Sequence, residues 1–290
     1  MIDDFVTYSL NMHGRLVKIE RPWVMGIVNV TTDSFHAASR AESEDAVTRI
    51  VGEMTAQGVD VIDVGACSTR PGATLVSEEE EYIRLETGLK ALRKVAPGHM
   101  VSVDTFRASV ARRAVEEWGA DIINDVSGAT FDPDMGRVAA SLQVPLVVMH
   151  NQGVPAASAA VAPYDDVTAQ VLEWLARRVD DLRQQGVCDV IVDPGFGFGK
   201  SIDDNFSLLA HLQVFHSLQC PLLVGMSRKS MVCCTLDCAP ADALNGTTVL
   251  TTLALQAGAH IIRVHDVEPA VQARTLVARY HGKEQRSSNL

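Results

Sequence analysis

The chain has 290 residues, of which 47% are hydrophobic and 21% are charged, and its formal net charge at pH 7 is −11. This length and composition are ordinary for a globular protein with a sizeable core, and they fit one large α/β domain. The acidic charge without a basic cluster argues against nucleic acid as a partner, and no apolar run approaches the roughly 20 residues of a membrane span.

Eight short apolar runs recur along the chain, and a helix-like stretch follows each of them. In chain order the runs span residues 24–28, 59–64, 100–103, 122–123, 146–149, 190–192, 222–224 and 261–262. The expected helices span residues 43–58, 77–96, 107–119, 133–142, 164–186, 205–218, 241–258 and 267–280. This alternation predicts a parallel (β/α)8 TIM barrel over residues 23–281, within a single domain that covers residues 1–290.

The N-terminal segment precedes this alternation. Residues 12–17 contain His13-Gly14, a pair that suits a tight hairpin turn, and we expect a short hairpin here that plugs the bottom of the barrel. The six cysteines form no CxxC pair and the first residues form no secretory apolar stretch, so we expect reduced thiols and a cytoplasmic protein.

Each apolar run ends on polar or charged residues, and a parallel barrel gathers the carboxyl ends of its strands at one mouth. We therefore expect these residues to share a site: Asn29, the segment 68–70, Asp104, Asn124, His150, Asp193, the segment 227–229, Arg263 and His265. Three long connections, residues 30–42, 65–76 and 151–163, follow such strands and are expected to act as lids or ligand loops.

The segment 193–200 reads Asp-Pro-Gly-Phe-Gly-Phe-Gly-Lys and is the sharpest motif. Its glycines allow the backbone to approach a flat ligand closely, and Phe198 can stack on a ring. Asp104, Asn124 and Asp193 together suit the donor-rich edge of an aminopyrimidinone, since only acceptors satisfy several N–H groups at once. The alternative for these three oxygen-bearing side chains is a divalent metal site. The neighbouring glycines and Phe198 favour the heterocycle.

Cations follow several strands and can hold an anion despite the acidic net charge. The candidates are Arg70, Arg228, Lys229 and Arg263. Arg263 and His265 stand two apart, on one face of an extended segment, and suit a phosphate or oxyanion. The alternatives are a solvated loop at 227–230 and a His265 that is satisfied by Asp266 in a helix cap. Cys67 has no adjacent His or Lys to lower its pKa, so we expect no catalytic role for it.

Taken together, dispersed motifs of this chain resemble those of the dihydropteroate synthase family. They lie at residues 25–31, 68–73, 102–105, 122–125, 149–150, 193–200, 225–230 and 263–266, in the family's order. The family joins 6-hydroxymethyl-7,8-dihydropterin diphosphate to p-aminobenzoate and releases diphosphate. The resemblance implies the same transferase reaction here, in a homodimer that uses Mg²⁺.

The resemblance also assigns residues. It implies a pterin site at Asp104, Asn124, Met149, Asp193, Gly197, Phe198, Gly225 and Lys229. It implies a diphosphate site at Asn29, Arg263 and His265, with Mg²⁺ on Asn29, and a p-aminobenzoate site at Phe35, Thr69, Arg70, Pro71 and Ser230. Asn29, Arg70, Lys229, Arg263 and His265 are the implied catalytic set. Charge neutralisation of the leaving diphosphate by Mg²⁺, Arg263 and His265, rather than a base, is the expected chemistry.

The chain departs from the family pattern in its first two long loops. Thr32 replaces a proline, Ala37 replaces an aspartate, Ala38 and Ser39 replace two glycines, and Cys67 replaces a glutamate. These changes bear on loop closure, p-aminobenzoate affinity and the response to sulfonamides. They keep one alternative open, a non-catalytic or impaired pterin-binding relative. A pterin-dependent corrinoid methyltransferase is the second alternative.

Overall fold

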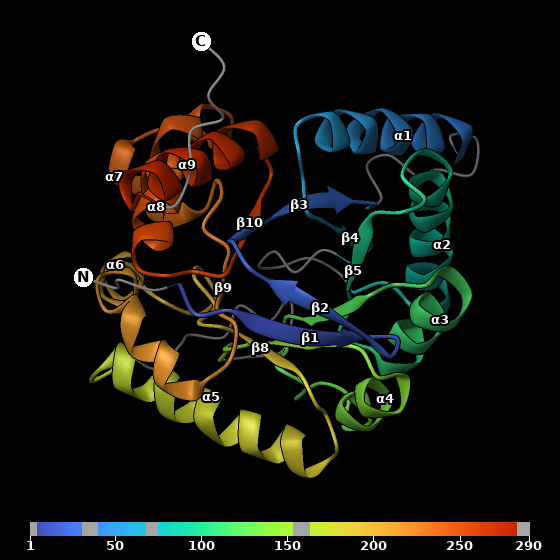
Figure 1. Cartoon of the computed structure of the whole chain (residues 1–290), viewed down its shortest axis with the longest axis horizontal. Coiled ribbons are helices and arrows are strands. Elements are labelled where there is room, and N and C mark those ends of the chain that lie inside the picture. Colours follow the sequence, from blue (N-terminus) through green and yellow to red (C-terminus); the bar gives the residue numbers. More distant parts are fainter. Residues whose placement is uncertain (1–4, 31–39, 68–74, 153–162, 283–290) are drawn as a thin grey trace.

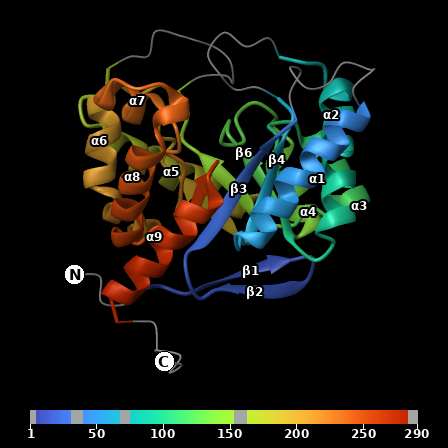
Figure 2. The ribbon, with the colours of Figure 1, turned by 90° about the horizontal axis from the view of Figure 1, so that it is seen from above.

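Parallel strands form the centre of the molecule, and helices surround them (Figures 1 and 2). The structure is a computed structural model that describes residues 5–30, 40–67, 75–152 and 163–282. The strands are β3 Trp23–Asn29, β4 Val61–Gly65, β5 Met100–Asp104, β6 Ile122–Asp125, β7 Leu146–Met149, β8 Val190–Asp193, β9 Leu223–Val224 and β10 Ile261–Val264. Their order is β8-β7-β6-β5-β4-β3-β10-β9, and a bridge between Val192 and Leu222 brings β8 and β9 together. The predicted (β/α)8 barrel is confirmed.

Helices follow the strands as the sequence predicts, with two differences. They are α1 Arg40–Ala56, α2 Glu78–Val95, α3 Ala108–Trp118, α4 Met135–Leu142, α5 Val167–Gln184, α6 Ile202–Ala210, α7 Ser230–Leu236, α8 Leu244–Gln256 and α9 Val267–Tyr280. The helix expected over residues 205–218 is instead α6 and a separate 3₁₀ segment, Leu212–Leu218. The short helix α7 was not predicted, because its seven residues are too few to show a periodic pattern.

An N-terminal hairpin lies across one end of the barrel (Figure 2). Its strands, β1 Tyr8–Met12 and β2 Arg15–Ile19, pair antiparallel around His13 and Gly14, which both have positive φ, as a type I′ turn requires. Leu10, Met12 and Ile19 are buried in one cluster with residues from seven barrel strands. The hairpin therefore plugs the bottom of the barrel, as predicted.

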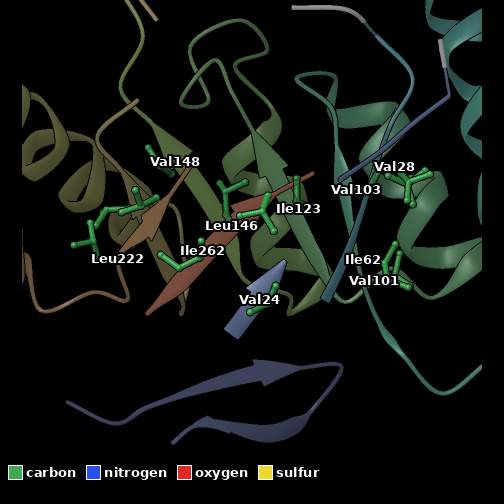
Figure 3. Packing of buried hydrophobic residues seen from close by; sticks show 14 of the residues in the cluster. Val24, Val28, Ile62, Val101, Val103, Ile123, Leu146, Val148, Leu222 and Ile262 are labelled. Carbon is green, nitrogen blue, oxygen red and sulfur yellow. The ribbon is translucent and has the colours of Figure 1, made fainter. Parts of the chain in front are cut away.

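Side chains alternate along each strand between the barrel interior and the surrounding helices. In β4, Val61 packs inward with the hairpin cluster, whereas Ile62 and Val64 belong to the outer core against the helices. Figure 3 shows Ile62 among the residues of this outer core. Asp63, two residues after Val61, therefore points inward again, one step nearer the mouth. Strand β10 repeats the pattern, with Ile261 in the floor and Arg263 above it. The barrel interior thus has an apolar floor with a polar layer above it.

Two further observations concern the chain as a whole. All six cysteines are free thiols. Within the described ranges, every helix is either too short or too polar to cross a lipid bilayer.

Candidate active site

One guanidinium in the polar layer is held between two carboxylates. Arg263 donates from Nε to Asp63 Oδ2 and from Nη2 to Asp104 Oδ2, both at 2.7 Å. Asp63 is fully buried and also accepts a hydrogen bond from Asn124 Nδ2 at 3.1 Å. Strands β4, β5, β6 and β10 are therefore tied together around Arg263. This network uses three residues that the sequence placed in the site and adds Asp63.

Asp63 was not predicted as a site residue. Its role depends on Arg263, which is 200 positions away in the sequence. The sequence feature that could have pointed to Asp63 is its position as a single carboxylate inside an apolar run. A charged group that is buried with a strand needs a partner, so it is a candidate for an ion pair. Among the described residues, its second oxygen, Oδ1, is buried and has no hydrogen-bond partner.

The electrostatics of this network leave Asp104 short of stabilisation. The pKa of Asp104 is raised to about 7, mainly by burial and also by the charges of Asp63 and Glu81, against the opposing effect of Arg263. One guanidinium does not fully compensate two neighbouring carboxylates. The side chain of Asp104 retains 14% of its exposure at the mouth, so a ligand can reach it. A donor group from a ligand would therefore find a carboxyl oxygen in need of a partner.

Asp193 and Lys229 form a second centre beside the first. Asp193 ends β8, where its Oδ1 accepts from the N–H of Gly195 at 2.7 Å. Lys229 Nζ donates to the carbonyl oxygen of Phe196 at 2.5 Å and lies 4.6 Å from the ring centroid of Phe198. Burial lowers the pKa of Lys229 to about 8, while Asp193 acts in the opposite direction. The predicted residues Asp193, Phe198 and Lys229 are thus neighbours.

Apolar and glycine positions shape the wall of this centre. Met149 is buried with Phe106 and Val126, and Phe198 packs partly against them. Gly197 has a φ of +80°, and a Cβ there would stand 2.9 Å from Lys229 Cδ, so this close approach requires glycine. Gly225 follows β9, and a Cβ there would lie within 4.0 Å of Arg263 and Lys229. The predicted wall positions Gly197 and Gly225 therefore lie against the two cations, and Met149 packs with Phe198.

His265 lies at the rim and keeps solvent access. Its Nδ1 is 3.0 Å from Ser227 Oγ, and its backbone N–H donates to the same oxygen at 3.2 Å. Loss of hydration around the ring lowers the pKa of His265 to about 4, and the cations Arg263 and Arg228 contribute in the same direction. The ring is neutral at pH 7, so it contributes a hydrogen bond rather than a positive charge. When the Ser227 hydroxyl donates to Nδ1, the ring proton is on Nε2, which can then donate outward.

Two polar residues expected at the mouth serve the scaffold instead. Arg228 forms a bidentate ion pair with Asp266, with Nε–Oδ2 at 2.9 Å and Nη2–Oδ1 at 2.6 Å, so it is not a free anion ligand. Because Asp266 is engaged by Arg228, it is not the hydrogen-bond partner of His265. His150 follows Met149 and therefore points away from the barrel interior. It packs edge-on against Trp174 with ring centroids 5.1 Å apart.

The remaining predicted residues divide into two groups. Asn29 at the end of β3 and Ser230 at the start of α7 are both exposed at the mouth side of the barrel. Phe35, Thr69, Arg70 and Pro71 lie outside the described residues, as do Thr32, Ala37, Ala38 and Ser39. Burial raises the pKa of the Cys67 thiol, which agrees with its expected lack of a nucleophilic role.

The alternative of a metal cage at Asp104, Asn124 and Asp193 does not fit this geometry. Asp104 and Asn124 are hydrogen-bonded to Arg263 and Asp63, and Asp193 is engaged by the Gly195 N–H. In the part of the chain that the structure describes, no group of three or more His, Cys, Asp or Glu side chains is placed to hold a metal ion. The arrangement instead offers acceptors, two cations and an apolar wall to a flat polar ligand.

Comparison with known proteins identifies this arrangement. A family model described as pterin binding enzyme matches residues 25–265. The chain is 40% identical to the dihydropteroate synthase of Escherichia coli strain K12 over 271 residues, which cover 93% of this chain and 95% of the relative. It is 41% identical to the Bacillus subtilis dihydropteroate synthase over 251 residues, 86% of this chain and 85% of that one.

Solved structures agree with these sequence matches. Xanthomonas albilineans dihydropteroate synthase with 4-aminobenzoic acid superposes with a TM-score of 0.85 at 38% identity, covering 95% of this chain and 98% of that chain. Yersinia pestis dihydropteroate synthase in a sulfonamide drug complex gives a TM-score of 0.87 at 36% identity, covering 95% of this chain and all of that chain. A family model that spans the barrel and relatives that match nearly end to end lead to one conclusion: the chain belongs to the pterin-binding enzymes, in the dihydropteroate synthase family.

Proposed function

We propose that this chain joins 6-hydroxymethyl-7,8-dihydropterin diphosphate to p-aminobenzoate, forming 7,8-dihydropteroate and releasing diphosphate. The observation that carries the proposal is the convergence of Asp104, Asn124, Asp193, Lys229 and Arg263 at one barrel mouth. A chain of the dihydropteroate synthase family with this set intact has the groups that the reaction needs.

The pterin ring binds in the polar layer of the barrel. Asp104 and Asn124 stand side by side in the register of β5 and β6, and Met149 and Asp193 do so in β7 and β8. The carboxylates accept from the amino and ring N–H groups of the pterin, and Lys229 donates to its ring oxygen and nitrogen. Phe198 covers one face. In support, a Xanthomonas albilineans dihydropteroate synthase has been solved with 6-chloroguanine, another bicyclic ring with an aminopyrimidine edge.

The diphosphate leaves toward the rim. Arg263 and the neutral, outward-donating His265 hold its oxygens, and no general base is required, because the leaving group needs charge neutralisation. Asn29 is exposed at the end of β3, and its amide oxygen would hold Mg²⁺ together with substrate phosphates and water. The ion would supply the positive charge that His265 does not. The C–O bond breaks and its electron pair leaves with the diphosphate, the aniline nitrogen forms the C–N bond, and that nitrogen loses one proton to water.

p-Aminobenzoate binds between the first two long loops and α7. Ser230 is the exposed first residue of α7, directly after Lys229. Phe35, Thr69, Arg70 and Pro71 complete this pocket in the proposal, on the strength of the family motif. The Xanthomonas albilineans structure with 4-aminobenzoic acid supports a binding site for this substrate in the family.

The protein acts as a homodimer in the cytoplasm. Val249 and Leu253 are four residues apart on α8 and are 51% and 46% exposed, while Leu276 and Tyr280 repeat this spacing on α9 at 70% and 76%. These four exposed apolar side chains lie on two helices that contact each other, which suits a second copy of the chain. Leu253→Glu combined with Leu276→Glu is expected to convert a dimer to a monomer in sedimentation experiments. A wild-type monomer would contradict this part of the proposal.

A diphosphate-release assay tests the activity and separates the alternatives. The proposal expects release that requires both the pterin diphosphate and p-aminobenzoate, with 7,8-dihydropteroate as the product. A pterin-binding relative without activity would bind the pterin diphosphate in calorimetry but release nothing. A methyltransferase would instead change the absorption spectrum of an added corrinoid protein.

A further inference from the structure

The ammonium group of Lys200 is held by three main-chain carbonyl oxygens. Its Nζ donates to Gly195 O at 2.8 Å, to Phe198 O at 3.0 Å and to His150 O at 3.3 Å. A lysine ammonium has three N–H donors, so these carbonyls use all of them. Two of the oxygens belong to the segment after β8 and the third follows β7. Lys200 therefore joins the segment 194–199 to the neighbouring strand end.

The path of this segment explains why a cation is needed there. Gly195, Gly197 and Gly199 all have positive φ, so the backbone turns repeatedly and forms no regular ladder. A Cβ at Gly195 would lie 2.0 Å from His150 O, which shows how closely the segment packs on the end of β7. Three carbonyl dipoles that converge on one point repel one another unless a positive charge lies between them.

The same segment places the groups that contact Lys229. The carbonyl oxygen of Phe196 accepts from Lys229 Nζ, and the ring of Phe198 lies beneath that ammonium. We propose that Lys200 is a positioning residue that acts as an internal cation, fixing segment 194–199 so that Lys229 and Phe198 meet the pterin ring in a preformed geometry. This inference rests on the proposed function of the site. It assigns Lys200 no contact with substrate.

Burial disfavours the charge of this ammonium, so the carbonyl oxygens around it have to stabilise it. Burial lowers the pKa of Lys200 to about 7, whereas Asp193 and Asp204 act to raise that pKa. The ammonium is thus held in a poorly hydrated place, where bulk water does not replace its bonds to the carbonyls. A removed side chain would leave a space lined by three carbonyl oxygens, and a small primary ammonium ion can occupy such a space.

The decisive experiment is chemical rescue of Lys200→Ala. We expect the KM for the pterin diphosphate to rise about tenfold or more, while kcat and the KM for p-aminobenzoate change by less than about threefold. Propylammonium, which replaces the missing atoms, should restore the lower KM, whereas tetramethylammonium, which has no N–H donor, should not. Lys90→Ala is the matched control, because Lys90 is exposed on α2, and neither the substitution nor the amines should change its kinetics.

Several results would overturn the inference. One is an unchanged KM for the pterin diphosphate. Another is a parallel loss in all kinetic constants without rescue, since a purely structural role predicts that result. If tetramethylammonium lowered the KM of Lys200→Ala as well as propylammonium does, hydrogen bonds to the three carbonyl oxygens would not be needed, and the inference would also fail.

Two measurements keep the test independent of variant folding and of the assigned reaction. In the wild-type protein without substrate, amide hydrogen exchange over residues 195–199 should be slow, because Lys200 already fixes the segment; exchange at the rate of an unstructured peptide overturns the inference. If the wild-type protein releases no diphosphate, the proposed function fails on its own. The Kd for the pterin diphosphate from calorimetry then replaces KM in the comparison with Lys200→Ala.

Discussion

Asp63 offers the sharpest test of how the barrel interior is held together. Both donors that reach it, Arg263 Nε and Asn124 Nδ2, bind the same oxygen, Oδ2, and Oδ1 has no partner among the described residues. In Asp63→Asn, the amide oxygen can therefore take the place of Oδ2 and keep both hydrogen bonds. The negative charge is lost, and the amide NH2 group takes the place of Oδ1. Asp63→Leu removes the charge and the acceptor together.

The expected magnitudes follow from this geometry. A hydrogen bond to a charged group contributes about 1.5–3 kcal/mol, against about 0.5–1.5 kcal/mol for a neutral pair. Because Arg263 keeps Asp104 as a partner, Asp63→Asn should lower the free energy of unfolding by about 2 kcal/mol. Asp63→Leu leaves two donors without an acceptor and should lower it by about 4 kcal/mol, as for a broken buried ion pair.

Urea unfolding at pH 8 measures these differences, and Asp104→Asn is the matched control on the same guanidinium. Because folding raises the pKa of Asp104, its negative charge costs free energy in the folded protein at pH 8, so Asp104→Asn should not lower the free energy of unfolding. It should instead weaken binding of the pterin diphosphate. Equal stability of Asp63→Leu and the wild-type protein would refute the reasoning, because no buried acceptor would then be needed.

Three further predictions address the site and the scaffold. Lys229→Met should raise the Kd for the pterin diphosphate at least about tenfold in calorimetry, since each buried acceptor left unpaired costs about 1–3 kcal/mol; an unchanged Kd would remove Lys229 from the pterin site. Gly197→Ala should weaken that binding because its Cβ meets Lys229. Gly14 has a similar φ of +79° with nothing within 4 Å of a Cβ, so Gly14→Ala should lower the free energy of unfolding by only about 1–2 kcal/mol, from backbone strain, and should bind normally. Burial lowers the pKa of His260 to about 4, so between pH 6.5 and 4 this histidine is protonated in the unfolded chain but not in the folded protein. The free energy of unfolding should therefore fall by about 3 kcal/mol as the pH drops from 6.5 to 4. His260→Gln should flatten that part of the pH dependence in urea unfolding, and a slope equal to that of the wild-type protein would contradict the assignment.

The fold could be predicted from the sequence because each barrel strand is buried on both faces and appears as a short apolar run. The positions of Asp104, Asn124, Asp193 and Arg263 followed from the same logic, since parallel strands end on one side. The hydrogen-bond and ion-pair partners of the polar residues at the mouth could not be predicted from the sequence. Arg228 pairs with a residue 38 positions away, and such a choice depends on the register of the strands.

The sequence also did not distinguish which strand-end residues face inward. Side chains alternate along a strand, so a residue one position beyond an inward-facing group points to the helices. Met149 therefore reaches the site while His150 packs against Trp174. The ends of the apolar runs were located to within a residue or two, which is too coarse to settle this alternation.

The electrostatics of the mouth explain how a strongly acidic chain can bind an anionic substrate. Deep in the barrel, two carboxylates share one guanidinium, so the interior favours the neutral, donor-rich edge of a heterocycle over an anion. Asp104, with a pKa near 7, gains hydrogen bonds from such an edge that Arg263 alone does not provide. In the proposed site the diphosphate lies at the rim, where Arg263 and the neutral donor His265 hold its oxygens and solvent is close. The proposed site thus holds the heterocycle of the substrate deep in the barrel and its diphosphate at the rim. The net charge of −11 opposes binding only of the diphosphate, where water and salt already screen the charges.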